Sequence, residues 1–315
     1  MLIEASQGSE VGTKKVKKVK KVKRPTISVL MAARDAEATI SIAAKSTLLA
    51  LGKRDELLVY LDGCMDNTAS AIHAIDDTRL RIYGSQDSIG RSGARNYLSL
   101  KAKGDCLAIL DSDDISFPWR FLHARRLLRT HDAVFGGSVL FGDLPFRLPF
   151  AFSYPVSLSA DLAPSVLTYR NPFIHSTAVF RREAVIVGEL YEDVLAEEYL
   201  LWVRMALRGV SLFRSPLPVI GYRLHRGQVS NSADFYQNSE KCPILNSERE
   251  LLAKKIFGEL RVEPCASSNK IDYLRQIVLS QSIGIRFEEQ FLAALKRRLK
   301  VIGVLFKLWE GSRRN

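Results

Sequence analysis

Short apolar runs alternate with segments of helical periodicity over the first third of the chain. The pattern predicts buried strands, apolar on both faces, at 26–33, 56–62, 79–83 and 105–111. It predicts helices between them at 35–51, 66–75 and 93–103. Strands of this kind, separated by helices, indicate an α/β fold with a mostly parallel sheet and helices on both sides. In such sheets ligands bind at the carboxyl ends of the strands.

The pattern becomes irregular after residue 130. Glycine, proline and aromatic residues are mixed through 131–180, which predicts loops and irregular strands. Regular elements are predicted beyond this region, as strands at 176–182 and 218–225 and as a helix at 196–209 that ends at Gly209. The chain is helical in pattern beyond residue 240. We therefore predict one catalytic-type domain over 25–235 and a helical region over 236–315.

The composition fits a folded protein with basic tails. Hydrophobic residues make up 47% of the 315 residues and charged residues 25%, which excludes a disordered or collagenous chain. The net charge is +12, but residues 1–24 carry +6, residues 286–315 carry +5, and the body between them only +1. The low-complexity, Lys-rich segment 11–24 predicts a solvated tail, and residues 1–24 are expected to form a basic disordered tail. A nearly neutral body argues against a specific nucleic-acid-binding groove.

The cysteines and the apolar runs indicate the compartment. The four cysteines include no CxxC pair and have no histidine cluster beside them, so neither a zinc site nor a disulfide framework is expected. No run reaches the eighteen or so apolar residues of a membrane span, and the Lys-rich start lacks the apolar core of a signal peptide. We expect a cytoplasmic protein.

Three carboxylates crowd the end of the predicted strand at 105–111. They lie in Asp111-Ser112-Asp113-Asp114, and because like charges repel, a fold that gathers them usually supplies a cation. Hard oxygen ligands favour Mg2+ or Mn2+, which bind alongside phosphate oxygens. The alternative is an acidic turn that caps a helix starting near residue 117.

Five motifs in order strengthen the metal-site interpretation. They are ISVLMAARDAEATI, LDGCMDNT, GARN followed by AKGDCLAILDSDD, STAVFRREAV followed by AEEYLLWVRMA, and YRLHRGQVS. Together they resemble the family 2 glycosyltransferases of the GT-A fold over about residues 25–235. The resemblance implies an enzyme that transfers a sugar from a nucleotide-diphosphate sugar, most often a UDP-sugar.

The resemblance assigns the donor site to the first strand ends. Asp62 would accept a hydrogen bond from the base, with a turn position ahead of Gly63 as the alternative. Leu61 replaces the first of the two acids usual there. Asp35 and Glu37 would face the nucleotide, with capping of the following helix as the alternative. Arg91 and Arg95, at a Gly-flanked helix start, suit a diphosphate, with an ordinary surface position as the alternative.

The same resemblance assigns the metal site to the acidic cluster Asp111–Asp114. It also assigns to this cluster the contacts with the ribose and the diphosphate. Asp111 and Asp113 would bind the metal, with Ser112 between them in the nucleotide site and Asp114 in a supporting position. His225, after the last predicted strand, would be the third ligand. A lone histidine near a strand end is otherwise an ordinary core or surface residue.

The general base is expected in AEEYLLW. By the resemblance it is the second acid, Glu198, with Glu197 as its neighbour. Two acids at a helix start also suit the helix dipole without any catalytic role. Trp202 lies on the face of Glu198 and is expected in the core or in the acceptor pocket.

These residues predict an inverting, metal-dependent, single-addition transfer to a glycan or lipid-linked acceptor. The lack of a QxxRW element and of membrane spans argues against a processive synthase. Two alternatives stay open: a silent nucleotide-binding scaffold tethered by basic tails, and a sugar nucleotidylyltransferase. The amphipathic segment 286–309 either lies in an anionic membrane interface or docks on the catalytic domain. The first option places the protein peripherally at the inner face of the cell membrane.

Overall fold

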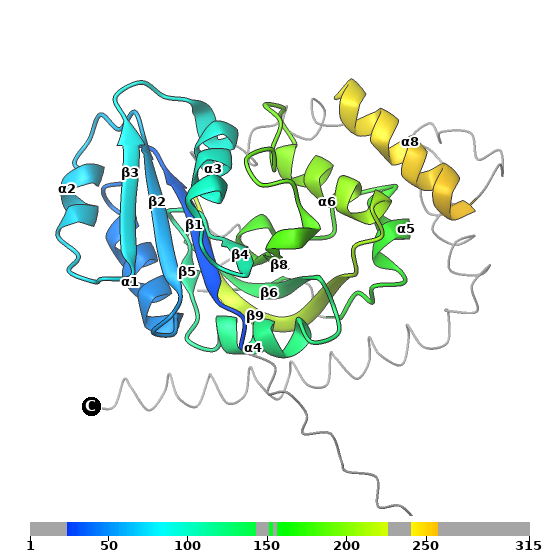
Figure 1. The fold of residues 1–315 in the computed structure, drawn as a ribbon, viewed down its shortest axis with the longest axis horizontal. Helices are drawn as coiled ribbons and strands as arrows, with labels where there is room; N and C mark the ends of the chain where they lie inside the picture. Colours follow the sequence, from blue (N-terminus) through cyan, green and yellow to red (C-terminus); the bar gives the residue numbers. More distant parts are fainter. Residues whose placement is uncertain (1–23, 143–150, 154–155, 226–240, 258–315) are drawn as a thin grey trace, which may run out of the picture.

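The four apolar runs of the first third form the parallel half of a twisted sheet (Figure 1). The structure is a computed structural model that describes residues 24–142, 151–153, 156–225 and 241–257. The parallel strands lie in the order β3-β2-β1-β4 and span Leu80–Ser85, Glu56–Asp62, Ile27–Ala33 and Cys106–Ile109. The helices between them are α1 (Ile40–Ala50), α2 (Thr68–His73) and α3 (Gly90–Lys101). All four predicted strands are therefore confirmed.

The sheet continues beyond β4 with mixed pairing. The order runs on through β8 (Val179–Arg181), β6 (Ala133–Gly142), β9 (Leu212–Leu224) and β5 (Ile115–Ser116), while β7 (Ala151–Phe152) pairs with β6. The pairs β4–β8, β6–β8, β6–β7 and β5–β9 are antiparallel, and β6–β9 is parallel. The α/β sheet expected from the sequence is confirmed, and its second half is mixed because the irregular segment after residue 130 lacks regular helical crossovers.

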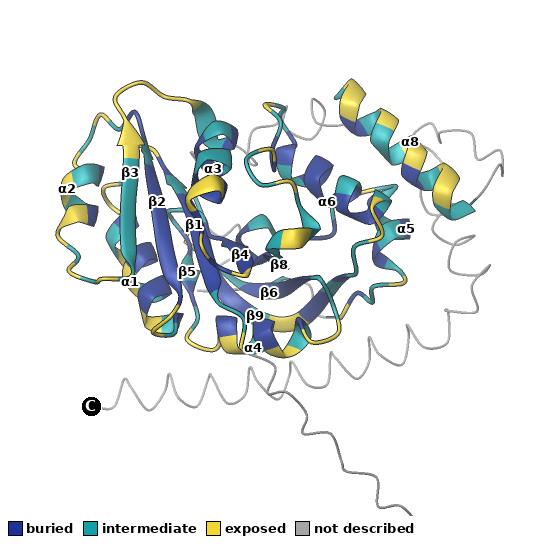
Figure 2. Ribbon diagram, viewed as in Figure 1, coloured by how far each residue is buried: buried dark blue, intermediate teal, exposed yellow. Residues whose placement is uncertain are grey.

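Helices cover the two faces of the sheet. Alternate residues of β1 point to opposite faces, so Val29 and Met31 pack with α1 and with Phe121 of α4 (Arg120–Leu127). Leu30 packs on the other face, in the cluster that contains α3 and α6 (Glu197–Leu207). Figure 2 shows the strands as the buried centre between these layers.

The helix predicted at 196–209 is observed as α6, and Gly209, with φ of 78°, ends it as expected. A short helix, α5 (Ala163–Leu167), and a long one, α8 (Pro243–Phe257), lie beside it. Leu245 and Leu252 of α8 are buried in the same cluster as α6. The start of the predicted helical region thus packs against α6, while 286–309 lies outside the described residues.

Two 3-10 turns complete the element list, at His175–Thr177 and Arg182–Ala184. Within the described ranges, no helix combines the length and the apolar character needed to cross a bilayer.

Candidate active site

The carboxyl ends of β2, β1 and β4 meet at one edge of the sheet, because β1 pairs in parallel with both neighbours. Asp62 ends β2 and is 4% exposed. Its two carboxylate oxygens accept hydrogen bonds from the Ile89 amide (2.7 Å) and the Ser88 hydroxyl (2.8 Å). Asp62 therefore fixes the loop that leads into α3, and its predicted contact with a base stays a prediction.

Asp35 and Glu37 lie in the loop that follows β1, and both accept hydrogen bonds from the loop that follows β2. Asp35, held at φ of 45°, accepts a hydrogen bond from the Met65 amide at 2.7 Å. Glu37 accepts two bonds from Asn67, from its backbone and its side-chain nitrogen, both at 3.0 Å. Helix α1 begins after Thr39 without a side-chain cap, so the capping alternative for these acids is wrong. Asp35 and Glu37 are both exposed at the strand-end edge. Their contact with a nucleotide stays a prediction.

The cluster Asp111–Asp114 follows β4 and meets the end of β9. The Asp113 carboxylate lies 3.0 Å from Nε2 of His225, although the two residues are 112 positions apart. Asp114 is 1% exposed and accepts a hydrogen bond from the Arg223 amide at 2.9 Å. Helix α4 starts at Arg120 with no side-chain cap, so this cluster does not cap it. The structure brings together two of the three predicted metal ligands.

Asp111 is turned toward α3 rather than toward His225. Its carboxylate accepts bonds from Nη2 of Arg95 (2.7 Å) and from the Ser176 hydroxyl (2.8 Å). Burial alone would raise the pKa of Asp111, but Arg95 outweighs it and holds the pKa at about 2. Asp111 is thus a permanent anion.

The negative charges of Asp113 and Asp114, the other acids of the cluster, are poorly compensated. Burial and the charge of Asp111 raise the pKa of Asp113, and burial together with both neighbouring acids raises that of Asp114 well above its usual range. Oδ2 of Asp114 is buried without a hydrogen-bond partner among the described residues. Arg120 lies fully buried close by, donating to the Ile109 carbonyl (2.6 Å) and the Ser116 hydroxyl (3.0 Å). Such a cluster is suited to receive a cation.

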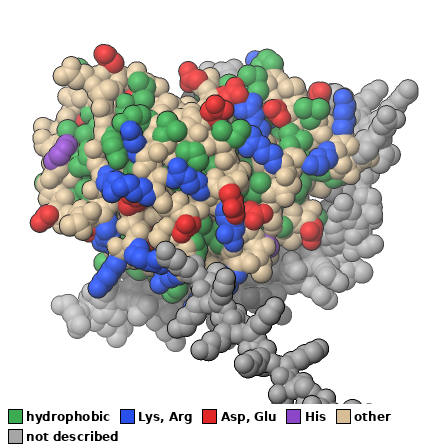
Figure 3. Space-filling model, in the orientation of Figure 1, with side chains coloured by type: hydrophobic (Ala, Val, Ile, Leu, Met, Phe, Trp, Pro, Cys, Tyr) green, Lys and Arg blue, Asp and Glu red, His purple; other side chains and the backbone are tan. Residues whose placement is uncertain are grey.

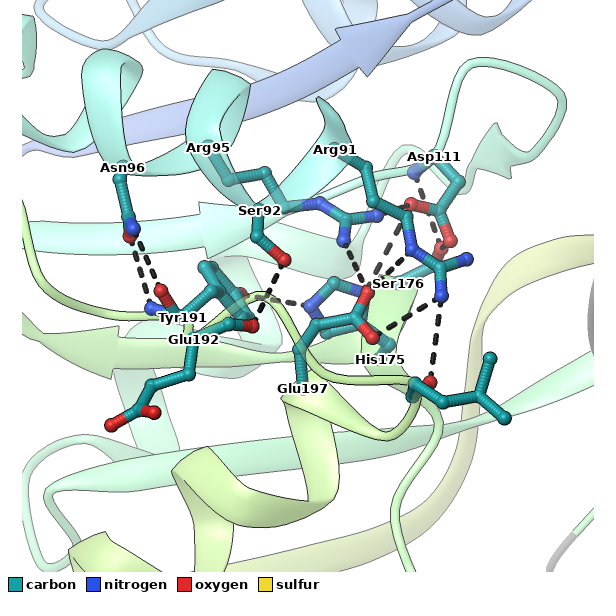
Figure 4. Close-up of polar contacts among 11 residues, drawn as sticks. Arg91, Ser92, Arg95, Asn96, Asp111, His175, Ser176, Tyr191, Glu192 and Glu197 are labelled. Carbon is teal, nitrogen blue, oxygen red and sulfur yellow. Dashed lines mark hydrogen bonds and ion pairs between the residues drawn. The ribbon is translucent and has the colours of Figure 1, made fainter. Parts of the chain in front are cut away.

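Two arginines of α3 bind the first acid of α6 (Figure 4). Nε of Arg91 lies 2.8 Å from Oε1 of Glu197, and Nη1 of Arg95 lies 3.2 Å from the same oxygen. Glu197 is 2% exposed and Arg95 6%. Arg95 therefore bridges Asp111 and Glu197, and links the acidic cluster to the start of α6. Arg91 is about two-fifths exposed, and its predicted diphosphate contact stays a prediction.

Glu198 is the next residue, and its environment differs from that of Glu197. No ion pair or side-chain hydrogen bond to its carboxylate is recorded within the described part of the chain. Burial, reinforced by the charge of Glu197, raises the pKa of Glu198 to about 7. An unpaired carboxylate with such a pKa has the property required of a general base near neutral pH.

Sequence reasoning missed three residues beside this network. Ser176 holds Asp111, and His175 contacts the Tyr191 hydroxyl through Nε2 at 2.8 Å. Burial lowers the pKa of His175 to about 3, so its imidazole is neutral. The signal was the polar HST at the start of an apolar strand, where a buried histidine needs a partner.

Trp202 is fully buried among Phe135, Phe173 and Phe180. Its predicted position in the core is confirmed.

Comparison with known proteins identifies the family. A model described as glycosyl transferase family 2 matches residues 28–186, half of the chain. The chain belongs to glycosyl transferase family 2. The matched range includes the acidic cluster, both arginines and Ser176, whereas α6 lies beyond it.

Bacterial family members resemble the chain over most of its length. WfaP of Escherichia coli, a UDP-Glc:alpha-D-GlcNAc-diphosphoundecaprenol beta-1,3-glucosyltransferase, is 27% identical over 204 residues, which cover 65% of this chain and 79% of WfaP. WbnJ of Escherichia coli, an O-antigen biosynthesis glycosyltransferase, is 25% identical over 237 residues, covering 73% of this chain and 90% of WbnJ.

Two solved structures share the fold. TarS 1–349 of S. aureus in complex with UDP-GlcNAc aligns with a TM-score of 0.57 and 15% identity, over 74% of this chain and 71% of TarS. The mannosyltransferase PcManGT from Pyrobaculum calidifontis, in complex with GDP-Man and Mn2+, aligns with a TM-score of 0.52 and 15% identity, over 88% of each chain. The predicted GT-A fold is confirmed, and this family 2 member is a glycosyltransferase.

Proposed function

We propose that the protein transfers one sugar at a time from a UDP-sugar to a hydroxyl of a glycan or lipid-linked acceptor, with inversion at the anomeric carbon. One observation carries the proposal. The bonded chain Asp111–Arg95–Glu197 joins the acidic cluster to the start of α6, where the next residue, Glu198, has a raised pKa. These bonds would hold a donor site at the cluster and a base on α6 in a fixed relation to each other.

The donor side rests on the strand-end edge. WfaP is named for a UDP-Glc donor and TarS was solved with UDP-GlcNAc, and both support a uridine nucleotide here. Asp35, Glu37 and Asp62 would face the nucleoside, with Ser112 beside the ribose. Arg91 and Arg95 would face the diphosphate, Arg91 being the more exposed of the two.

The acidic cluster fits a divalent cation. Asp113 and His225 offer a carboxylate and an imidazole within 3.0 Å, and the unpartnered buried oxygen of Asp114 marks a local excess of negative charge. Within the described residues no group of three or more such ligands is preassembled, because Asp111 is held by Arg95 and Ser176. We assign Mn2+ or Mg2+ to Asp111, Asp113 and His225. When bound, such an ion neutralises charge on the leaving diphosphate.

Glu198 supplies the base. The acceptor oxygen bonds to the anomeric carbon while the bond from that carbon to the diphosphate oxygen breaks, and Glu198 takes the hydroxyl proton. A direct displacement of this kind inverts the configuration, because the acceptor enters opposite the leaving group. Glu197 is not assigned this role, because its carboxylate is occupied by ion pairs with Arg91 and Arg95.

The acceptor class follows from relatives. WfaP is named for a diphosphoundecaprenol-linked acceptor and WbnJ for O-antigen biosynthesis, which supports a lipid-linked glycan and a place at the inner face of the cell membrane. A silent scaffold is disfavoured by the unpaired Glu198, and a nucleotidylyltransferase by the Arg34-Asp35 loop after β1, which lacks a Gly-rich, Lys-bearing sequence.

A donor screen tests the proposal. UDP should raise the melting temperature more with Mn2+ than with EDTA, and Asp113→Asn should abolish that difference. Glu198→Gln should keep UDP affinity within a few fold and lose transfer by on the order of 10²-fold or more. The anomeric configuration of the product, measured by NMR, should be inverted. An unchanged metal effect in Asp113→Asn, or a retained configuration, would refute the corresponding part.

A further inference from the structure

The edge of the sheet opposite the catalytic carboxylates carries exposed cations. The strands β1, β2 and β4 begin there in register, with Ile27 opposite Cys106 and Ser28 opposite Glu56. Exposed Lys or Arg residues stand two or three positions before each strand, and two more lie on or just after α4. The six residues, which we call the basic edge, are Arg24, Lys53, Arg54, Lys103, Arg126 and Arg129.

Contacts within the fold bring these residues together. Arg54 donates to the carbonyl of Arg24 at 3.0 Å. Arg125 of α4 donates to the Pro25 carbonyl at 2.9 Å and pairs with Asp55, which places the end of α4 beside the strand starts. Figure 3 shows Lys and Arg side chains gathered toward the lower left of the molecule, where Figure 1 places the start of β2.

The acids of this edge are engaged inside the fold. Asp55 accepts bonds from the amides of Ile27 and Gly52 and from Arg125. Glu56 bonds the Ser28 hydroxyl and the Lys103 amide. None of the six cations forms an ion pair with an acid in the described ranges. One further acid of the edge, Asp105, is exposed and accepts hydrogen bonds from Thr26. Six exposed cations therefore outnumber the exposed acid, and the edge keeps an excess of positive charge toward solvent.

Helix α4 adds apolar groups to this surface. Trp119 and Leu122 are 45% and 47% exposed, and together with Arg126 and Arg129 they fall on one face of the helix. Leu217, 39% exposed, lies beside them, because the indole of Trp119 donates to the neighbouring Pro218 carbonyl at 2.8 Å. One face thus combines a large aromatic, two leucines and several cations.

We propose that the basic edge, with Trp119, Leu122 and Leu217, docks on an anionic phospholipid bilayer. Cations near an anionic leaflet each strengthen binding about fivefold, and an exposed Trp with neighbouring leucines suits the headgroup boundary. Eight of the residues 14–24 are Lys or Arg, and this run ends at the basic edge itself. Binding of a nucleic acid would use the cations but leave the apolar groups unexplained. Residues 286–315, which carry +5, have the wrong charge to cover this face.

Docking here leaves the catalytic edge exposed to solvent. Glu56 begins β2 and Asp62 ends it, so the docked and catalytic ends are about 20 Å apart. This consequence rests on the proposed function: the nucleotide-sugar and the growing end of a glycan would reach the strand ends from the cytoplasm, while the enzyme stays on the membrane.

Vesicle sedimentation of the full chain tests this inference. The edge variant is Lys53→Gln, Lys103→Gln and Arg129→Gln, and the matched control is Arg170→Gln, Arg208→Gln and Lys254→Gln, three exposed cations elsewhere. Vesicles are phosphatidylcholine alone or mixed equally with phosphatidylglycerol. At low salt, the edge variant should bind the anionic vesicles about 10²-fold more weakly than wild type, and the control only slightly more weakly. Leu122→Asn should weaken binding, whereas Leu251→Asn, equally exposed on α8, should not.

Several outcomes overturn the inference. If the edge variant and the control bind anionic vesicles equally, the contact lies outside the basic edge, in residues 1–24 or 286–315. If wild type binds neutral and anionic vesicles equally, the binding is not electrostatic. Tight binding to a homopolymeric RNA without vesicle binding identifies a nucleic acid instead. Donor binding, measured as the rise in melting temperature with UDP and Mn2+, should be unchanged in the edge variant. A loss of vesicle binding can therefore be distinguished from a loss of donor binding, and the two proposals are tested separately.

Discussion

Replacing the proposed base should stabilise the protein, and should do so only at higher pH. Glu198 has an ordinary pKa near 4.5 in the unfolded chain and about 7 in the folded protein, because burial and Glu197 oppose its charge. Between these values the folded state holds more protons than the unfolded state. Stability therefore falls as the pH rises from about 4.5 through 7, and the full penalty applies above pH 7.

The size of the penalty follows from the shift. A rise of the Glu198 pKa from 4.5 to about 7 corresponds to about 3 kcal/mol of unfolding free energy, and because Glu198 is partly exposed, screening by water reduces this to about 2 kcal/mol. Glu198→Gln is neutral at every pH and avoids the penalty. We expect the variant to gain about 2 kcal/mol at pH 8 and little at pH 5, which corresponds to a rise in melting temperature of about 5 °C at pH 8.

Urea denaturation at pH 5 and pH 8 measures this gain without knowledge of the substrate. Glu250→Gln, at an exposed position of α8, is the matched control and should change stability little at either pH. An equal gain for Glu198→Gln at both pH values would show that ionisation is not its cause. A loss at pH 8 would refute the idea that Glu198 is held in an unfavourable charged state.

Three further predictions concern the same network and the core beneath it. Glu197→Gln removes the charge that raises the pKa of Glu198, so the acid limb of the kcat/KM profile should move to lower pH; a limb that stays in place would contradict this. Arg95→Met removes the ion-pair partner of Asp111 and one of the two partners of Glu197 and should cost about 3–5 kcal/mol of unfolding free energy, while Arg91→Met, at a more exposed position, should cost clearly less. Trp202→Ala should cost about 3–5 kcal/mol and Trp119→Ala under about 1 kcal/mol in the same denaturation assay, and similar losses would be inconsistent with the burial difference.

The sequence predicted the strands more reliably than the helix starts. The run at 56–62 coincides with β2 because seven consecutive residues, six of them buried, leave no ambiguity of pattern. The helix expected from residue 35 begins at Ile40, since Asp35 adopts a positive φ and the turn at Ala36–Thr39 is fixed by bonds to the second loop. Those bonds come from residues about 30 positions away, which local periodicity does not register.

The acidic cluster was predictable because its three acids are adjacent in the chain. The pairing of Asp113 with His225 was expected only through the family resemblance, because nothing in the spacing of 112 residues indicates contact. The role of Arg95 was incompletely foreseen. Its position at a helix start suggested a diphosphate contact, whereas the folded chain also places it between Asp111 and Glu197.

The arrangement of charge explains why these acids are retained at a cost to stability. Arg95 neutralises Asp111 and shares Glu197 with Arg91, but Asp113, Asp114 and Glu198 keep pKa values raised by burial and by neighbouring acids. A fold selected for stability alone would replace such groups with apolar residues. In the proposed reaction the excess negative charge at the strand-end edge has two uses, since the cluster would accept a cation with a diphosphate and Glu198 would accept a proton. A bound cation or proton relieves part of the repulsion that folding leaves in place, so both should bind more tightly to the folded protein than to isolated carboxylates, whereas the anionic diphosphate is expected to bind only together with the cation.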